Sequence, residues 1–138
     1  MKKIFNQKVG IIIQARMGSS RFPGKTLKNL NGKPSLWHVV NRCRTSKLAD
    51  TVIVATTSDS SDDRIALFCA KHKIPCHRGS VDNVLSRYYE TAKKFKLDTV
   101  ARITADCPLI NPATIDRVFK AHAEQRCDYV INVFPGKR

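Results

Sequence analysis

Short apolar runs recur along the chain and predict β-strands. Most of these runs are rich in β-branched residues and are bounded by polar segments, which is typical of strands buried on both faces of a sheet. The predicted strands are Val9–Gln14, Thr51–Ala55, a brief extended stretch at Ile74–Cys76, Thr99–Thr104 and Asp128–Asn132.

Between these runs, apolar residues recur with the i, i+3, i+4, i+7 spacing of amphipathic helices. Pro34 suits the first turn of the first helix, and Ser60 or Ser61 is placed to cap the second. The third helix is predicted to open near Asp82. The four apolar faces are Leu36, Val39, Val40 and Cys43; Ile65, Phe68, Cys69 and His72; Leu85, Tyr88, Ala92 and Phe95; and Ile115, Val118, Phe119 and His122.

Strands that alternate with helices predict an α/β fold in which a parallel sheet carries helices on its faces. No internal repeat, low-complexity tract or linker divides the 138 residues, so we expect one domain over 1–138. In such sheets, ligands bind beyond the carboxyl ends of the strands. The segments expected there are 15–25, 56–63, 77–83 and 105–111.

The charge of the chain favours an anionic partner. Twenty-five Lys and Arg against eleven Asp and Glu leave a net charge of +14, which suits either a nucleic acid or a polyphosphate. The ten aromatic residues do not alternate with Arg or Lys as a base-stacking platform would require, which disfavours a nucleic acid, although charge alone does not choose between the two. No apolar run approaches the roughly 20 residues of a membrane-spanning helix, so we expect a cytoplasmic protein without a membrane partner.

The five cysteines include no Cys-x-x-Cys pair, so the sequence predicts neither a disulfide framework nor a zinc ribbon. Cys69, His72, Cys76 and His77 have the side-chain types of a zinc site. Cys76 and His77 are adjacent, however, and would point in opposite directions in an extended segment. The favoured interpretation is half-buried thiols and solvent-facing imidazoles.

The loop after the first predicted strand has the composition of a phosphate-binding loop. Residues 14–25 contain three cations, two glycines and two hydroxyl side chains. Glycines let backbone amides approach an anion closely, and the arginine fork matches phosphate oxygens. The loop is therefore predicted to bind a triphosphate, and a solvated basic loop of no special shape is the alternative.

Two familiar phosphate-binding loops do not fit this segment. The dinucleotide pattern G-x-G-x-x-G is absent, because Gly18 is followed next by Gly24. Gly24-Lys25-Thr26 ends like a P-loop, but Ser19 stands where the first glycine of that motif belongs. A P-loop also passes straight into a helix, whereas residues 27–34 intervene here. A P-loop kinase is therefore disfavoured.

The same loop is part of a longer signature. Residues 11–27, IIIQARMGSSRFPGKTL, and residues 32–34, GKP, resemble the N-terminal signature of cytidylyltransferases that activate acidic sugars, the spore-coat polysaccharide branch and its CMP-KDO and acylneuraminate kin. Three further segments resemble the family at its spacing: VATT at 54–57 with Asp62-Asp63, RGSVDNVLSRYY at 78–89, and RITADCPLI at 102–110. The resemblance implies a three-layer α/β/α nucleotide-diphospho-sugar transferase fold, which is Rossmann-like with a mainly parallel sheet.

The resemblance also implies a reaction. A sugar hydroxyl would attack the α-phosphate of CTP, giving a CMP-sugar and pyrophosphate in surface polysaccharide biosynthesis. Arg16, Lys25 and Asp106 are the expected catalytic residues. Arg16, Arg21 and Lys25 would hold the β- and γ-phosphates, and Asp106 would bind Mg²⁺. A helix cap or a loop residue is the alternative for Asp106, because Asp is favoured at such sites.

Further residues are expected to contact the nucleotide. The backbone amides around Gly18 and the Ser20 hydroxyl would support the phosphates. Thr56 and Thr57 would lie beside the pyrimidine, and Arg102 either pairs with a buried carboxylate or points toward the ligand. The full set is Ala15, Gly18, Ser19, Ser20, Arg21, Thr56, Thr57, Asp82 and Arg102.

The sequence departs from the family pattern in two residues and in length. Ala105 stands where the family commonly has Gly, and Asn111 stands where it often has Asp. Family members continue for roughly another hundred residues, the size of a further half-domain. That part carries a second acidic metal ligand, sugar contacts and much of a dimer interface, so the chain is expected to be truncated and a homodimer stays possible. A catalytically impaired nucleotide-binding fragment and a basic nucleic-acid-binding module are the alternative functions.

Overall fold

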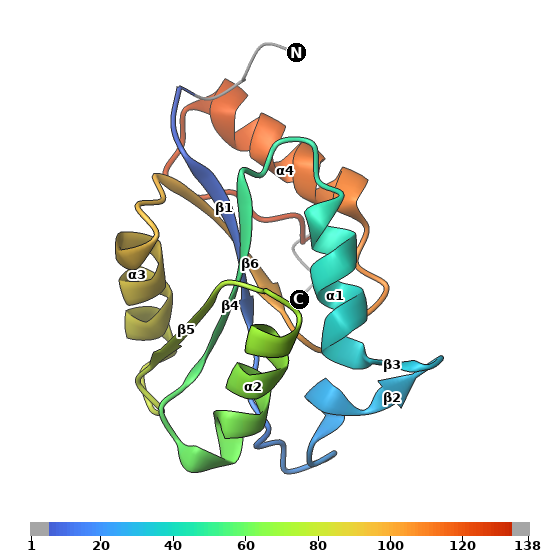
Figure 1. Cartoon of the computed structure of the whole chain (residues 1–138). Helices are drawn as coiled ribbons and strands as arrows, with labels where there is room; N and C mark the ends of the chain where they lie inside the picture. The colour runs from blue at the N-terminus through green and yellow to red at the C-terminus, as the bar shows by residue number, and fades with distance from the viewer. Residues whose placement is uncertain (1–5, 134–138) are drawn as a thin grey trace, which may run out of the picture.

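The computed structural model describes residues 6–133, and its centre is a four-stranded sheet (Figure 1). The strands are β1 (Val9–Gln14), β4 (Thr51–Thr57), β5 (Cys76–Gly79) and β6 (Thr99–Thr104). Their order is β5-β4-β1-β6, and every neighbouring pair is parallel. The carboxyl ends of all four strands therefore lie at one edge of the sheet, and Gln14 of β1 is in register with Thr104 of β6.

Helices cover both faces of this sheet. Helices α1 (Ser35–Arg44), α2 (Asp63–Lys71) and α4 (Pro112–Gln125) lie on one face, and α3 (Val84–Lys94) lies on the other (Figure 1). Because side chains alternate along a strand, Ile11 and Ile13 join the core under α1, α2 and α4, whereas Ile12 is buried on the α3 face. Each fully buried isoleucine stabilises the fold by about 1.5–3 kcal/mol. The predicted three-layer α/β/α fold is confirmed.

The segment between β1 and α1 contains a hairpin that the sequence analysis treated as part of a loop. After the 3₁₀ helix η1 (Lys25–Leu27), β2 (Asn29–Leu30) pairs antiparallel with β3 (Lys33–Pro34). Asn31 and Gly32 form the turn, with φ of 51° and 84°. Asn-Gly is the preferred sequence for a two-residue turn with two positive φ angles, so the signal was present in the sequence.

The predicted strand Asp128–Asn132 is wrong. These residues follow α4 without regular structure, and Tyr129 and Ile131 are exposed. A strand forms where neighbouring backbone groups pair with its own, and no strand among residues 6–133 pairs with this segment. The alternation of apolar residues was therefore not sufficient to predict a strand here.

Two other boundaries differ from the sequence-based expectation, whereas the start of the third helix agrees with the expected opening near Asp82. Strand β5 begins at Cys76, because Pro75 has no amide to donate and only its carbonyl pairs, with the amide of Val54. Helix α3 is capped by Asn83, whose side chain accepts from the Ser86 amide. The 3₁₀ helix η2 (Ser60–Asp62) precedes α2, and Asp59 rather than a serine caps it.

None of the helices within residues 6–133 is both long and apolar enough to cross a membrane.

Candidate active site

A polar pocket of about 280 Å³ opens at the carboxyl ends of β1 and β6. The pocket is built by three stretches of chain: the end of β1 with the loop after it, η1, and the end of β6 with its following turn. The backbone pairing of the sheet continues into its floor, because the Ala15 amide donates to the Ala55 carbonyl and the Ala105 amide to the Gln14 carbonyl. The lining residues are Gln14, Arg16, Gly18, Ser19, Ser20, Arg21, Lys25, Thr26, Thr104, Ala105 and Asp106.

Three cations of the loop after β1 line this pocket. Arg16 and Arg21 are exposed, and no hydrogen bond or ion pair within residues 6–133 holds their guanidinium groups. The loop itself is closed by a bond from the Gly24 amide to the Met17 carbonyl, 3.1 Å, and Gly24 adopts a left-handed φ of 71°. At Gly18, a Cβ would meet no atom within 4 Å, so an open space borders the backbone there. The loop therefore presents positive charge and accessible backbone to the pocket.

Asp106 faces the cations from the other side of the pocket. Its Oδ2 lies 3.0 Å from the Lys25 Nζ, and the two side chains are 47% and 36% exposed. The Thr104 hydroxyl and then the Lys25 ammonium hold the pKa of the Asp106 carboxyl below its ordinary value. Asp106 is thus an ionised carboxylate at neutral pH, within reach of solvent and of a bound ligand.

The donor set around Asp106 fits a hard divalent cation that is shared with phosphate oxygens. Within residues 6–133, no group of three or more His, Cys, Asp or Glu side chains is arranged to hold a metal ion. Besides the Asp106 carboxylate, the pocket offers the neutral oxygens of Gln14 and Thr104. Mg²⁺ is commonly held by one or two carboxylates together with substrate phosphates and water, so a single carboxylate suits Mg²⁺ and does not suit a closed structural site.

The cysteine and histidine group of the sequence analysis lies elsewhere, on α2 and β5. Cys69 is fully buried, and its hydrogen bond to Cys76 is the chief cause of the lowered pKa of the Cys76 thiol. The expected solvent-facing imidazoles are not what the structure shows. The His72 ring packs at a tilt against the Phe68 ring, with 4.4 Å between ring centroids, and His77 lies 3.6 Å from the Glu90 carboxylate with only 16% of its side chain exposed.

Five of the predicted nucleotide contacts do not line the pocket. Ala15 is buried in the core. Thr56 points into the core, and the Thr57 hydroxyl donates to Asp62. Asp82 is exposed in the loop before α3, and the Arg102 guanidinium stacks 5.5 Å above the Tyr88 ring. Their roles stay predictions.

Three lining residues were not singled out from the sequence: Gln14, Thr26 and Thr104. Gln14 and Thr26 are adjacent in the chain to the predicted site residues Ala15 and Lys25, and Thr104 lies two positions before Asp106. Parallel pairing of β1 and β6 brings Gln14 and Thr104 side by side. The register of these two strands was the only feature that would have identified both residues together.

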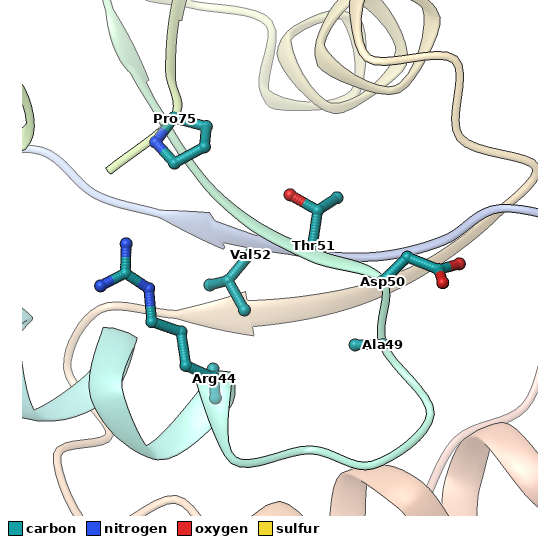
Figure 2. A pocket seen from close by; sticks show the side chains of 7 residues that line it. Arg44, Ala49, Asp50, Thr51, Val52 and Pro75 are labelled. Atoms are coloured by element: carbon teal, nitrogen blue, oxygen red, sulfur yellow. The ribbon is translucent and has the colours of Figure 1, made fainter. Parts of the chain in front are cut away.

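A second pocket, of about 260 Å³, lies at the opposite end of the sheet. Arg44 of α1, Val52 of β4 and Pro75 before β5 surround it (Figure 2). The Arg44 guanidinium donates to the Lys73 carbonyl, and no predicted site residue lines this pocket.

The chain resembles a known protein family over nearly its whole length. A family model described as cytidylyltransferase matches residues 10–135. The chain belongs to the cytidylyltransferase family. This confirms the resemblance carried by the loop after β1 and by the segment around Asp106.

Relatives within the cytidylyltransferase family include proteins of sugar metabolism. The chain is 37% identical over 122 residues to the spore coat polysaccharide biosynthesis protein SpsF of Bacillus subtilis (strain 168), covering 86% of the chain and 51% of that protein. It is 37% identical over 118 residues to the 3-deoxy-manno-octulosonate cytidylyltransferase of Anaeromyxobacter sp. (strain Fw109-5), covering 83% of the chain and 47% of that enzyme. The chain thus spans about half the length of these relatives.

Solved structures of the family agree with the fold. A cytidylyltransferase from Leptospira borgpetersenii serovar Hardjo-bovis (strain JB197) has a TM-score of 0.79 at 36% identity, covering 84% of the chain and 49% of that structure. A CMP:2-keto-3-deoxy-manno-octonic acid synthetase complexed with CTP has a TM-score of 0.73 at 27% identity, covering 86% and 48%. The Rossmann-like nucleotidyltransferase fold is shared over the length of chain that is matched.

Proposed function

We propose that the protein is an Mg²⁺-dependent cytidylyltransferase that forms a CMP-sugar from CTP and an acidic sugar. One observation carries this proposal: Lys25 and Asp106, 81 positions apart in sequence, meet in a pocket that Arg16 and Arg21 also line. Cations that face a lone carboxylate across an open pocket suit a polyphosphate and the metal ion that accompanies it. Membership of the cytidylyltransferase family supports CTP as the donor.

The proposed reaction is a substitution at the α-phosphorus of CTP. The hydroxyl oxygen of the sugar forms a bond to that phosphorus, the bond to the oxygen of the β-phosphate breaks, and the hydroxyl proton passes to solvent. Pyrophosphate leaves with the electron pair of the broken bond. Arg16, Arg21 and Lys25 would hold the β- and γ-phosphates and stabilise the charge that develops on the leaving group.

The phosphate side of the site also involves the backbone. The amides of Gly18 and Ser19 and the Ser20 hydroxyl would contact the phosphates, because these residues line the pocket. The Lys25 ammonium has three donors, so it can bind a phosphate while it keeps its contact with Asp106. Asp106 would hold Mg²⁺, which would supply positive charge to offset that of the phosphates.

The base and sugar side of the site rests on fewer observations. We place the pyrimidine beside Thr56 and Thr57, with Ala15 beneath it, and we assign Asp82 and Arg102 to the outer nucleotide or sugar contacts. The Thr57 hydroxyl already donates to Asp62, so base recognition there would use backbone groups. We also propose a cytoplasmic enzyme, where CTP is available, that works as a homodimer.

Thermal unfolding with added ligands tests the donor. CTP with Mg²⁺ is expected to raise the melting temperature more than ATP with Mg²⁺, and more than either nucleotide without the metal. A ligand at 100 times its Kd stabilises the folded state by about 2.7 kcal/mol. A larger shift with a short oligonucleotide at physiological salt would instead favour the basic nucleic-acid-binding module.

Pyrophosphate release tests catalysis separately from binding. The chain is incubated with CTP, Mg²⁺ and 3-deoxy-manno-octulosonate, and the same mixture without the sugar is the control. Sugar-dependent release supports the enzyme. Binding of CTP without any release would support the catalytically impaired nucleotide-binding fragment.

A further inference from the structure

Shortly after β1, hydrogen bonds hold the backbone of two successive residues, Arg16 and Met17. The Met17 amide donates to the Asp62 Oδ1 at 2.6 Å, and the Met17 carbonyl accepts from the Gly24 amide at 3.1 Å. One residue earlier, the Arg16 carbonyl accepts from the Thr26 hydroxyl at 2.9 Å. The pocket-lining residues Arg16 and Gly18 flank this anchored point directly.

Asp62 is buried, with 2% of its surface exposed, and it connects two strand ends. One carboxylate oxygen accepts from the Met17 amide, and the other accepts from the hydroxyl of Thr57, the last residue of β4. A buried carboxylate is costly to desolvate unless both oxygens find donors, so these two bonds belong together. Their effect is to tie the loop after β1 to the end of β4, the neighbouring strand in the sheet.

Helix capping does not explain why an aspartate stands at position 62. It occupies the N-cap position of α2, yet its side chain makes no capping bond to that helix. The preceding turn is capped by Asp59, which accepts from the Ser61 amide. The carboxylate of Asp62 is thus turned away from its own helix and toward a residue 45 positions earlier in the chain.

Buried positive charge also lies near this carboxylate. Arg87 of α3 is 1% exposed and donates through one guanidinium nitrogen to the Ser80 carbonyl at 2.6 Å. Burial lowers the pKa of Arg87, and the charge of Asp62 opposes that shift. Asp62 is therefore held by hydrogen bonds from the loop after β1 and from β4, and the charge of Arg87 favours its ionised form.

We propose that Asp62 is a positioning residue that fixes the phosphate-binding loop in its binding geometry before the ligand arrives. This inference rests on the proposed function and deepens it. The Met17 amide is the point at which Asp62 acts, and Thr26 supports the neighbouring carbonyl. With this anchor in place, Arg16 and the open backbone at Gly18 face the pocket in the free protein, and the ligand does not have to order them. Such preorganisation increases affinity without any contact between Asp62 and the ligand.

Asp116 provides a matched control. It too is a carboxylate that accepts from a hydroxyl, that of Ser46, and from the backbone amides of Lys47 and Leu48. It anchors the loop after α1, which contributes to the other pocket. Asp62→Ala and Asp116→Ala therefore remove the same kind of anchor from two different loops.

Two measurements test the proposal in the full chain. The first is the hydrogen–deuterium exchange rate of the Met17 amide, which is expected to rise by about tenfold or more in Asp62→Ala and to stay unchanged in Asp116→Ala. The second is the Kd for inorganic triphosphate with Mg²⁺, measured by calorimetry. We expect triphosphate binding to weaken about 10- to 100-fold in Asp62→Ala and less than threefold in Asp116→Ala.

Asp62→Asn separates hydrogen bonding from charge and serves also if Asp62→Ala does not fold. An amide oxygen still accepts from the Met17 amide, and the amide NH₂ donates to the Thr57 hydroxyl oxygen. Asp62→Asn is therefore expected to keep the Met17 exchange rate and to bind triphosphate within about threefold of the wild type. Equal loss in Asp62→Asn and Asp62→Ala would overturn the anchoring role.

The two measurements also separate this inference from the proposed function. If the wild type binds triphosphate and Asp62→Ala binds it equally well, the positioning role is wrong and the proposed function stands. If the wild type binds neither triphosphate nor CTP, the proposed function is wrong, and with it the claim that this anchor serves phosphate binding. An unchanged Met17 exchange rate in Asp62→Ala would overturn the anchor whatever the ligand does.

Discussion

The two ends of the sheet carry pockets of similar size but of opposite chemistry. At the amino end, Asp50, Asp98 and Asp116 all accept from backbone amides and thereby hold the chain in place. At the carboxyl end, the guanidinium groups of Arg16 and Arg21 have no hydrogen bond or ion pair among residues 6–133, and Asp106 is about half exposed. Side chains that are left available for a ligand, and not the volume of a pocket, distinguish the candidate active site.

The same contrast appears within the carboxyl end. Asp62 is buried and fully hydrogen-bonded, whereas Asp106 is exposed and paired with a single lysine. The first carboxylate suits a supporting role, and the second suits direct contact with a metal ion. The predictions below test this division, and the largest expected effect comes first.

Asp106→Asn is expected to have the largest effect. It removes the one exposed carboxylate of the pocket, so the dependence of CTP binding on Mg²⁺ should disappear and any turnover should fall by roughly 100-fold or more. Asp98→Asn, at the amino end, is the matched control and should behave like the wild type. Calorimetric titration of CTP with and without Mg²⁺ measures the effect, and an unaltered dependence on Mg²⁺ would exclude Asp106 as the metal ligand.

Arg21→Met and Arg44→Met compare one arginine from each pocket. Arg21→Met should weaken CTP binding by about 10- to 100-fold, because a charge-assisted hydrogen bond to phosphate is lost. Arg44→Met should leave the Kd for CTP unchanged. Equal weakening by the two substitutions would mean that net charge, and not the pocket at the carboxyl end, attracts the nucleotide.

Two cysteines report on the same two pockets. Burial raises the pKa of the Cys43 thiol to about 12, so at the amino end this thiol stays protonated and unreactive at neutral pH. Cys107 is exposed beside Asp106. Iodoacetamide should modify Cys107 and leave Cys43 intact, as read by mass spectrometry of peptides. CTP with Mg²⁺ should slow the reaction of Cys107 several-fold if the ligand binds beside Asp106, and no protection would argue against that placement.

The smallest expected effect is on stability at low pH. The pKa of Asp106 is lower in the folded protein than its ordinary value of 3.8. The contribution of the ionised Asp106 to folding stability is therefore complete above pH 3.8. It is lost as the pH falls through the lower pKa of the folded state. Because both partners are partly exposed, Lys25→Met should cost less than about 1 kcal/mol of unfolding free energy at pH 7. Denaturant unfolding at pH 7 and pH 3 measures this, and an undiminished cost at pH 3 would contradict it.

Much of the fold followed from the sequence because its strands are continuous apolar runs. The triple isoleucine of β1 and the valine-rich β4 are buried on both faces, so no other placement was available to them. The strand expected at 128–132 failed because pairing is a tertiary property that apolar alternation does not reveal. The Asn31-Gly32 hairpin was missed for a different reason: its strands are too short to show a periodicity.

The candidate site, like the fold, could be predicted from the sequence only in part. Residues 16–25 were singled out by their composition after a predicted strand, and Asp106 was singled out through the family resemblance. Thr56 and Thr57 belong to β4 itself and do not line the pocket, because both faces of this strand are covered; their contact with the base stays a prediction. Asp62 acts on Met17 through a contact across 45 residues, and only the folded chain brings the two together.

Mapping of CTP binding by NMR tests the central claim most directly. Amide shifts are recorded as CTP and Mg²⁺ are added to the labelled chain. If the nucleotide phosphates bind between the loop after β1 and the Asp106 carboxylate, the largest changes in amide shift should fall on Gly18, Ser19, Lys25 and Asp106. Changes that are confined to residues 43–52 at the opposite end of the sheet, or no changes at all, would contradict the account.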